Sequence, residues 1–320
     1  MTNIRQLTFN GDNGEAYFSN DNKKLIFQSK RDGNQCDKMY EYDLIENKIT
    51  PLPVDRGAFT CGYYGLNDEL FISSTIESGA DCPAIYKHPN PHKYIWPLRP
   101  FHIYSWKSGS GIKKLTAVNG YNAETTAHPF EEKLIFTSMQ NGDIDLYEMN
   151  YNGQNVKRIT TEYGYDGGAF FSPDGEKIVW RAWYPETDEE KKQWKTNLEK
   201  KYIEAVPLDL YIADRNGKNK KRLTNNGATN WAPFWHPDGE QIIFSSNKDD
   251  WNEKYQSYGH NFELYLININ SLHVDRITVN DTFDSFPMFS SDGKQLVFCS
   301  NRNSENARQT NVFIADITYP

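Results

Sequence analysis

Short apolar runs separated by polar turns recur along the entire chain. The clearest turns are FSPDG at 171–175, WHPDG at 235–239 and FSSDG at 289–293. In such a turn Pro presets φ, Asp bonds its own backbone and Gly tolerates positive φ, so the sequence predicts a hairpin. An apolar strand follows the turn position in each of six units, at 25–27, 70–72, 134–136, 178–180, 242–244 and 296–298.

Two further segments complete each unit. A third apolar run follows, at 39–40, 103–104, 146–147, 210–211, 264–265 and 312–313. A Leu-Thr or Ile-Thr pair then recurs, at 7–8, 49–50, 115–116, 159–160, 223–224 and 277–278. Units of roughly 40 to 45 residues with several strands each are typical of β-propeller blades, and three units are enlarged by insertions.

The two ends of the chain indicate how the ring closes. The last unit stops without a Leu-Thr strand, whereas the chain begins with one, Ile4 to Thr8, that no unit precedes. We therefore predict an all-β fold, a six-bladed β-propeller with four-stranded blades, in which the N-terminal strand completes the last blade and hides its edge. A single domain over 1–320 is expected, with blades at about 9–50, 51–116, 117–160, 161–224, 225–278 and 279–320 plus 1–8.

Composition narrows the functional classes. The formal net charge of −8 offers no basic face, which argues against nucleic acid as a partner. No apolar run is long enough to predict a membrane span. Met1 is followed almost at once by the closing strand, so we expect no signal peptide in the chain as written, and either a cytoplasmic protein or the processed part of an exported one. A monomer is expected.

With the repeats aligned, the sequence resembles the TolB-like family of propeller-repeat proteins over essentially its full length. The best segments are YDGGAFFSPDGEKIVWRA at 165–182, NWAPFWHPDGEQIIFSSN at 230–247 and FDSFPMFSSDGKQLVFCSNRN at 283–303; blades two and three depart at 66–68 and 130–132. The resemblance implies an exported, periplasmic binding or scaffold module whose partner is a protein, peptide or carbohydrate. Related propellers stand beside peptidase domains.

Three insertions, at 78–99, 184–207 and 248–261, occupy the same link between second and third strands, which predicts one elaborated face of the disc. Long loops on a rigid scaffold often bind ligands; the alternative is that their rings, including those of His92 and Tyr94, pack the loops onto the disc. A capping box at Thr187 and Glu190 predicts a helix in the second insertion. The candidate ligand-binding residues at this face are Trp96, Arg99, Arg181, Trp183, Trp251, Tyr258 and His260.

An Asn or Asp begins the first strand of five blades. First strands line the channel of a propeller, so these residues predict a polar ring at its mouth, where oxygen atoms could hold a divalent cation. The alternative is that each side chain caps its own turn. In blade two the position falls on Phe59 or Thr60. The five candidates are Asn13, Asn122, Asp166, Asn230 and Asp284.

Two functions remain open. We favour a non-catalytic TolB-like binding or scaffold propeller without a cofactor, except for a possible cation in the channel. The alternative is a metal-dependent lyase or hydrolase at the same end of the channel, since some pectin-cleaving lyases are propellers with a histidine-bound metal. No metal ligands can be named from spacing. A disulfide from Cys36 or Cys82 to Cys61 would suit an oxidising compartment, and three reduced thiols would suit the cytosol.

Overall fold

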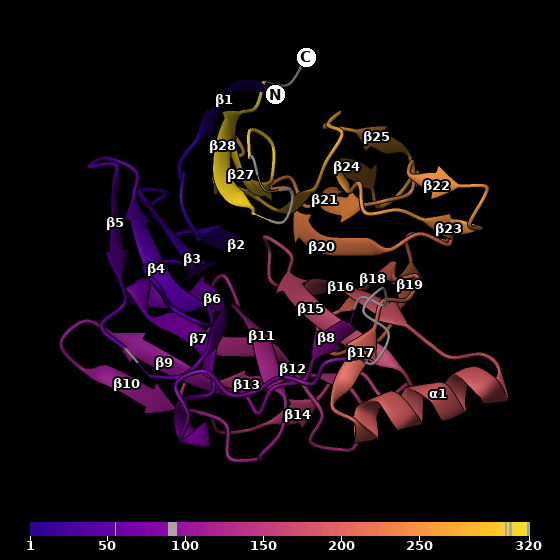
Figure 1. Ribbon diagram of the computed structural model, residues 1–320, viewed down its shortest axis with the longest axis horizontal. Coiled ribbons are helices and arrows are strands. Elements are labelled where there is room, and N and C mark those ends of the chain that lie inside the picture. Colours follow the sequence, from indigo (N-terminus) through magenta and orange to yellow (C-terminus); the bar gives the residue numbers. More distant parts are fainter. Residues whose placement is uncertain (55, 89–94, 305, 307–308, 319–320) are drawn as a thin grey trace.

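Six antiparallel four-stranded sheets surround a common centre in the computed structural model, which describes residues 1–54, 56–88, 95–304, 306 and 309–318 (Figure 1). Blades are numbered in chain order. Blade one contains β2 (Asp12–Phe18), β3 (Lys24–Lys30), β4 (Lys38–Asp43) and β5 (Lys48–Pro51). Blade two contains β6 (Phe59–Tyr64), β7 (Leu70–Ser74), β9 (His102–Lys107) and β10 (Gly111–Lys114). Blade three contains β11 (Asn122–Ala127), β12 (Lys133–Ser138), β13 (Asp145–Asn150) and β14 (Lys157–Arg158).

The second half of the ring repeats this order. Blade four contains β15 (Tyr165–Phe171), β16 (Lys177–Trp183), β18 (Asp209–Asp214) and β19 (Lys221–Arg222). Blade five contains β20 (Asn230–Trp235), β21 (Gln241–Ser246), β24 (Glu263–Asn268) and β25 (Val274–Arg276). Blade six contains β26 (Asp284–Phe289), β27 (Gln295–Ser300), β28 (Asn311–Asp316) and, from the other end of the chain, β1 (Thr2–Gln6).

The closing strand confirms the predicted fold. β1 pairs antiparallel with β28, and the Leu7 amide continues the ladder to the Val312 carbonyl at 2.8 Å. Both chain ends therefore lie together at the edge of one blade (Figure 1). The six-bladed propeller is closed by pairing of its first and last strands.

The recurrent Leu-Thr pair ties the outer strand to the third strand. The Thr224 hydroxyl accepts a bond from the Leu210 amide at 2.9 Å and donates one to Asp209, which also pairs with Arg222. The same amide-to-hydroxyl bond is made by the other threonines of the repeat except in blade one, namely Thr8, Thr116, Thr160 and Thr278.

Blade one departs from the predicted register. Leu52, buried at 7 % exposure, donates its amide to the Met39 carbonyl, the bond that Leu223 makes to Leu210 in blade four. Thr50 is exposed on β5. The repeat pair of this blade is thus Leu52-Pro53, and the assignment to Ile49-Thr50 was wrong because Pro53 replaces the threonine that marks the pair elsewhere.

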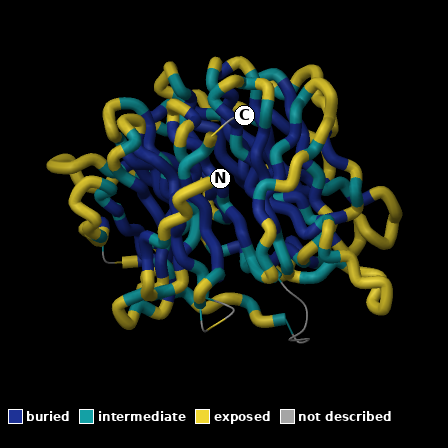
Figure 2. Tube along the Cα trace, turned by 90° about the horizontal axis from the view of Figure 1, so that it is seen from above, coloured by how far each residue is buried: buried dark blue, intermediate teal, exposed yellow. Residues whose placement is uncertain are grey.

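The core lies between neighbouring blades, with exposed residues concentrated in the loops (Figure 2). The second strands are its most buried part. Their central aromatic rings pack on a ring of the third strand, as Trp180 does on Tyr211 at 5.8 Å between centroids. Equivalent pairs are Phe27 with Tyr40 and Phe298 with Phe313.

All three insertions carry additional secondary structure. The first begins at the end of the 3-10 turn η2 (Ile76–Ser78) and contains β8 (Ile95–Pro97), and the third contains β22 (Trp251–Asn252) and β23 (Ser257–Tyr258). A further 3-10 turn, η1 (Leu66–Asp68), replaces the hairpin turn of blade two. The second insertion forms the predicted helix α1 (Asp188–Glu199), capped by Thr187 and followed by β17 (Tyr202–Glu204). No helix among the described residues is long and apolar enough to cross a bilayer.

Candidate functional site

A bulge interrupts the first strand of every blade at the same position. Pairing with the second strand shifts there, and one residue adopts positive φ, for example 51° at Glu15 and 58° at Glu124. We call these six residues the bulge residues: Glu15, Cys61, Glu124, Gly168, Ala232 and Phe286.

The bulge residues of blades one to three, Glu15, Cys61 and Glu124, line one cavity of about 310 Å³. Blade five and the first insertion also contribute, through Trp231 and through Trp96 and Arg99. A cavity that adjoins blades one, two, three and five lies at the centre of the ring, on the side of the insertions. We call it the channel cavity.

Two insertions meet over this cavity. β8 pairs antiparallel with β17, with Trp96 opposite Ile203, and the ladder extends through the Leu98 amide to the Lys201 carbonyl at 2.8 Å. Trp96 also packs edge-on against Trp231 at 4.5 Å between centroids. The β8–β17 clasp therefore fixes an aromatic ring at the cavity by joining loops from blades two and four.

A buried ion pair adjoins the channel cavity, which Glu124 lines. Arg181 Nη2 bonds Glu124 Oε1, while Glu124 Oε2 accepts from the Gly168 amide at 2.9 Å and the Thr137 hydroxyl at 2.7 Å. The guanidinium also lies 3.7 Å from the centroid of the Trp231 ring. Burial alone would lower the pKa of Arg181, but Glu124, together with smaller effects from Tyr165, Tyr121 and Glu15, outweighs burial and raises the pKa. Arg181 therefore remains charged and held in place.

Glu15 and Asp37 have no comparable partner. Burial raises the pKa of Glu15 to about 7, against the opposing effect of Cys61 and with a further rise from the Glu124 charge. Burial and then Asp12 raise the pKa of Asp37 to about 6, against the opposing effect of Arg99. Among the described residues, neither Glu15 Oε2 nor Arg99 Nη1 has a hydrogen-bond partner although both atoms are buried. Such atoms are costly unless water or a ligand bonds them.

The predicted binding residues occupy different places. Trp96 and Arg99 line the channel cavity, and Arg181 adjoins it through Glu124 and Trp231. The other four do not line it. Trp183 packs on Trp194 of α1 at 5.7 Å, and His260 is exposed. His92 and Tyr94 lie outside the described residues.

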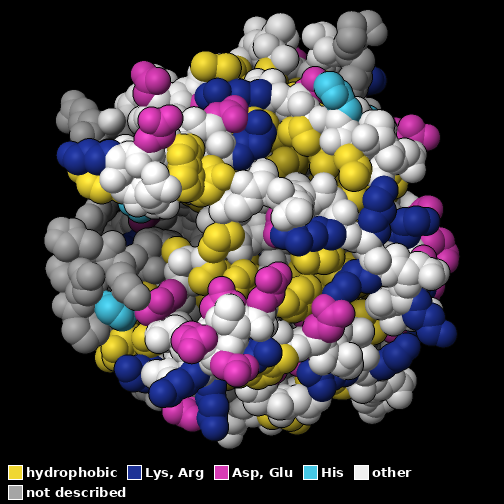
Figure 3. All heavy atoms as spheres, turned by 90° about the vertical axis from the view of Figure 1, so that its right-hand side faces the viewer, with side chains coloured by type: hydrophobic (Ala, Val, Ile, Leu, Met, Phe, Trp, Pro, Cys, Tyr) yellow, Lys and Arg dark blue, Asp and Glu magenta, His cyan; other side chains and the backbone are white. Residues whose placement is uncertain are grey.

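Trp251 and Tyr258 form a separate hairpin on β22 and β23. Their ring centroids are 4.8 Å apart, and the Tyr258 hydroxyl donates to the Asn226 carbonyl at 2.6 Å. Trp251 is 46 % exposed. The surface over this part of the molecule shows small groups of apolar side chains among charged ones (Figure 3).

The predicted polar ring lies two residues before the bulge. Asn13, Asn122 and Asn230 are buried, and each side-chain oxygen accepts from a serine of its own second strand at 2.8–2.9 Å. Asp166 accepts from Trp180 and Asp284 from Arg302. These bonds lie within the blade of each ring residue, as in the alternative in which each residue caps its own loop, but Asp166 Oδ2 is buried without a hydrogen-bond partner among the described residues. Among the described residues no cluster of His, Cys, Asp or Glu could hold a metal ion.

Phe59 occupies the corresponding position in blade two. The ring residues predicted from the sequence thus lie on the first strands, but two residues before the bulge residues. It is the bulge residues Glu15, Cys61 and Glu124 that line the cavity. The sequence signal for these residues is that the bulge position carries Glu or Cys in blades one to three, whereas it carries Gly, Ala or Phe in blades four to six. In those first three blades no Gly occupies the positive-φ position of the bulge, so no glycine marks it in the sequence.

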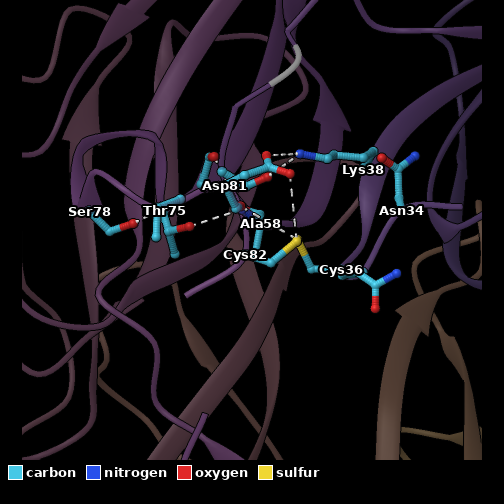
Figure 4. Close-up of a disulfide and its surroundings, with 12 residues drawn as sticks. Asn34, Cys36, Lys38, Ala58, Thr75, Ser78, Asp81 and Cys82 are labelled. Atoms are coloured by element: carbon cyan, nitrogen blue, oxygen red, sulfur yellow. Dashed lines mark hydrogen bonds and ion pairs between the residues drawn. A yellow bond between two sulfur atoms is a disulfide. The ribbon is translucent and has the colours of Figure 1, made fainter. Parts of the chain in front are cut away.

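The disulfide joins Cys36 and Cys82, with Cα atoms 5.7 Å apart (Figure 4). The proposed pairing of either cysteine with Cys61 was wrong, because Cys61 is a free, buried thiol on β6. Lys38 strengthens the same link by bonding Asp81 at 2.5 Å and the Gly57 carbonyl at 2.9 Å. The first insertion is therefore tied to blade one on both sides of Asp37, a residue of the channel cavity.

These features define a six-bladed β-propeller with a channel cavity capped by a clasp. No protein-family model matches the chain. It is 30% identical over 113 residues to the Tol-Pal system protein TolB of Francisella tularensis, covering 34% of this chain and 23% of that protein. It is 24% identical over 149 residues to the uncharacterized protein Atu1656 of Agrobacterium fabrum, covering 45% and 46%. It is 23% identical over 236 residues to Dipeptidyl-peptidase 5 of Porphyromonas gingivalis, covering 65% and 34%.

Solved structures agree on the fold. A putative TolB from Agrobacterium tumefaciens superposes with a TM-score of 0.62 at 17% identity, covering 97% of this chain and 91% of that one. An oligogalacturonate lyase in complex with manganese gives 0.54 at 16%, covering 98% and 93%. The chain therefore has a six-bladed propeller fold and a distant similarity to TolB proteins. The matches span less than half the length of each curated relative named above.

Proposed function

We propose that the protein is a non-catalytic binding propeller that receives part of a protein, peptide or glycan in the channel cavity. The observation that carries this proposal is the pair of buried, unpartnered atoms in the cavity, Glu15 Oε2 and Arg99 Nη1, beside the ring of Trp96. A ligand that bonds both atoms removes their desolvation cost, and Trp and Arg are the residues that most often dominate binding energy.

The surroundings support a preformed site. The clasp and the disulfide hold Trp96 and Asp37 in place before any ligand arrives, which limits the ordering cost of binding. A disulfide also supports a periplasmic or otherwise exported location, because disulfides persist in oxidising compartments. We propose that the protein acts there as a monomeric scaffold.

The binding test uses peptide and glycan arrays probed with the purified chain, followed by affinity measurements on the hits. Arg99→Met and Trp96→Ala should weaken binding by about 30-fold or more, equivalent to about 2 kcal/mol. Phe130→Ala is the control, since Phe130 is 69 % exposed in the turn between β11 and β12 of blade three. Hits that depend on Phe130 and tolerate both cavity substitutions would contradict the proposal.

A metal-dependent lyase or hydrolase at the same end of the channel is the second candidate. It is favoured by the cavity carboxyl of Glu15, whose pKa near 7 suits a general base. The resemblance to the manganese-bound lyase concerns the fold alone. Depolymerisation of acidic oligosaccharides by the wild-type chain with added Mn²⁺, abolished in Glu15→Gln, would establish this candidate over the first.

A further inference from the structure

Building on the proposed function, we propose that the channel cavity recognises a primary ammonium group, with Glu15 as the anion that receives it. The ligand would be a peptide that presents either its N-terminus or a lysine side chain. This assignment follows from the charges of the cavity, the unpartnered atoms in it and its size.

The charged groups around the cavity leave one carboxyl without a cation. Arg181 is bonded to Glu124, and Arg99 and, more weakly, Lys30 act on Asp37. Cys61 and Glu124 lie around Glu15. Arg181 also acts on Glu15, but its guanidinium is already paired with Glu124. A cationic ligand therefore complements the cavity, whereas an anionic ligand would add to the repulsion among the carboxyl groups.

An ammonium group suits this position better than the other common cations. It is a compact charge with three donors, so a single contact can both donate a hydrogen bond to Glu15 Oε2 and neutralise the Glu15 carboxylate. Divalent cations usually require several oxygen ligands, and no metal-binding cluster exists among the described residues. The aromatic rings of Trp96 and Trp231 add a further preference for positive charge.

Arg99 restricts what stands beside the ammonium group. Its unpartnered Nη1 is a donor, so it would bond an oxygen atom of the ligand, such as the first carbonyl of a peptide. A volume of about 310 Å³ is at the small end for ligand sites and admits the end of a chain or one side chain. A peptide provides an amine and a carbonyl oxygen within that volume.

The probes separate the two sources of the amine. Glycinamide represents a peptide N-terminus, Nα-acetyl-lysinamide represents a lysine side chain, and N-acetylglycinamide lacks the cation. Binding is followed by tryptophan fluorescence or NMR at pH 7.5. We expect one of the two amines to bind at least 10-fold more tightly than N-acetylglycinamide. Glu15→Gln should remove that preference, and Glu132→Gln, at an exposed turn position of blade three, should keep it.

Three results would overturn the ammonium assignment. They are equal binding of the acetylated probe, retention of amine binding in Glu15→Gln, and no binding of either amine up to 50 mM, a limit on the order of weak fragment affinities. None of them removes the proposed binding function, which depends on Trp96 and Arg99. That function fails separately if array hits are insensitive to Trp96→Ala and Arg99→Met.

Discussion

The outer edge of the disc repeats, whereas its centre does not. At the outer edge, five blades use the same threonine hydroxyl to receive an amide of the third strand. At the centre, the bulge shared by all six blades carries five different residue types, since only blades one and three share Glu. Backbone geometry is thus conserved around the ring, and the inner side chains vary without changing it. Chemical specificity can therefore develop at the centre at little cost to the fold.

The centre is itself divided. Blades one to three place Glu15, Cys61 and Glu124 at the bulge, and blades four to six place Gly168, Ala232 and Phe286 there. A Cβ on Gly168 would come within 1.7 Å of Arg181 Nη1. Arg181, from the second strand of blade four, therefore uses the space that glycine leaves and brings a positive charge to the acidic half.

The outer edge gives the largest predicted effect. Deleting residues 1–8 removes β1, Leu7 and Thr8, and leaves the edge of β28 unpaired. Several hydrogen bonds at about 1 kcal/mol each, plus the burial of Leu7 at about 2 kcal/mol, predict a loss of about 5 kcal/mol or more. Urea denaturation should show it, together with a broader transition as the ring loses cooperativity.

A matched control removes the hydroxyl and keeps the strand. Thr8→Val loses the bond to the Val312 amide and should cost only about 1–2 kcal/mol with a sharp transition. Equal stability of the truncated and full chains would show that the ring does not depend on strand closure.

The regularity of the outer edge explains why the sequence predicted the fold. Six turns, six second strands and a displaced Leu-Thr strand at the N-terminus were sufficient for topology and closure. Where the repeat itself varies, prediction was less accurate: Leu52-Pro53 lacks the threonine, and the register was assigned to Ile49-Thr50. The start of the helix was also predictable, because Thr187 and Glu190 form the capping box that the sequence indicated.

The centre could not be predicted to the same extent. Trp96, Arg99 and Arg181 were identified as insertion or strand-end residues, but their meeting depends on pairing of β8 with β17, loops that are about a hundred residues apart. The disulfide depends likewise on how two loops approach, so Cys36–Cys82 could not be distinguished from pairs with Cys61. Glu15 was missed because a bulge, rather than the alternation of a regular strand, orients it.

The second prediction concerns the division of the centre. Arg181→Met keeps the side-chain volume but leaves the Glu124 carboxylate buried without its cation. Loss of one partner of a buried pair costs about 3–5 kcal/mol. Chemical denaturation at pH 7 should therefore show a large decrease in the free energy of unfolding.

The double variant Glu124→Gln with Arg181→Met tests the cause. Removing both charges should recover most of the loss, because no unpaired ion remains and Gln can still accept from Thr137 and the Gly168 amide. If the double variant is as unstable as Arg181→Met, the loss comes from the packing of Arg181 on Trp231 rather than from charge.

The smallest predicted effect is the pH dependence contributed by Glu15. Because burial raises its pKa from 4.5 to about 7, the folded protein holds a proton that the unfolded chain has released between these values. The contribution to stability is complete below about pH 4.5 and is lost as pH rises through 7, with an upper limit of about 3 kcal/mol. Glu15→Gln cannot titrate, so its stability relative to wild type should rise from pH 5 to pH 8.

Asp37 and Asp166, whose pKa values are also raised, are present in both proteins and cancel in the difference. Urea melts at four pH values, with Glu132→Gln as the exposed control, measure that difference. Parallel curves for wild type and Glu15→Gln would mean that Glu15 is already ionised in the folded protein, and the acidic half of the channel would then carry more charge than its burial suggests.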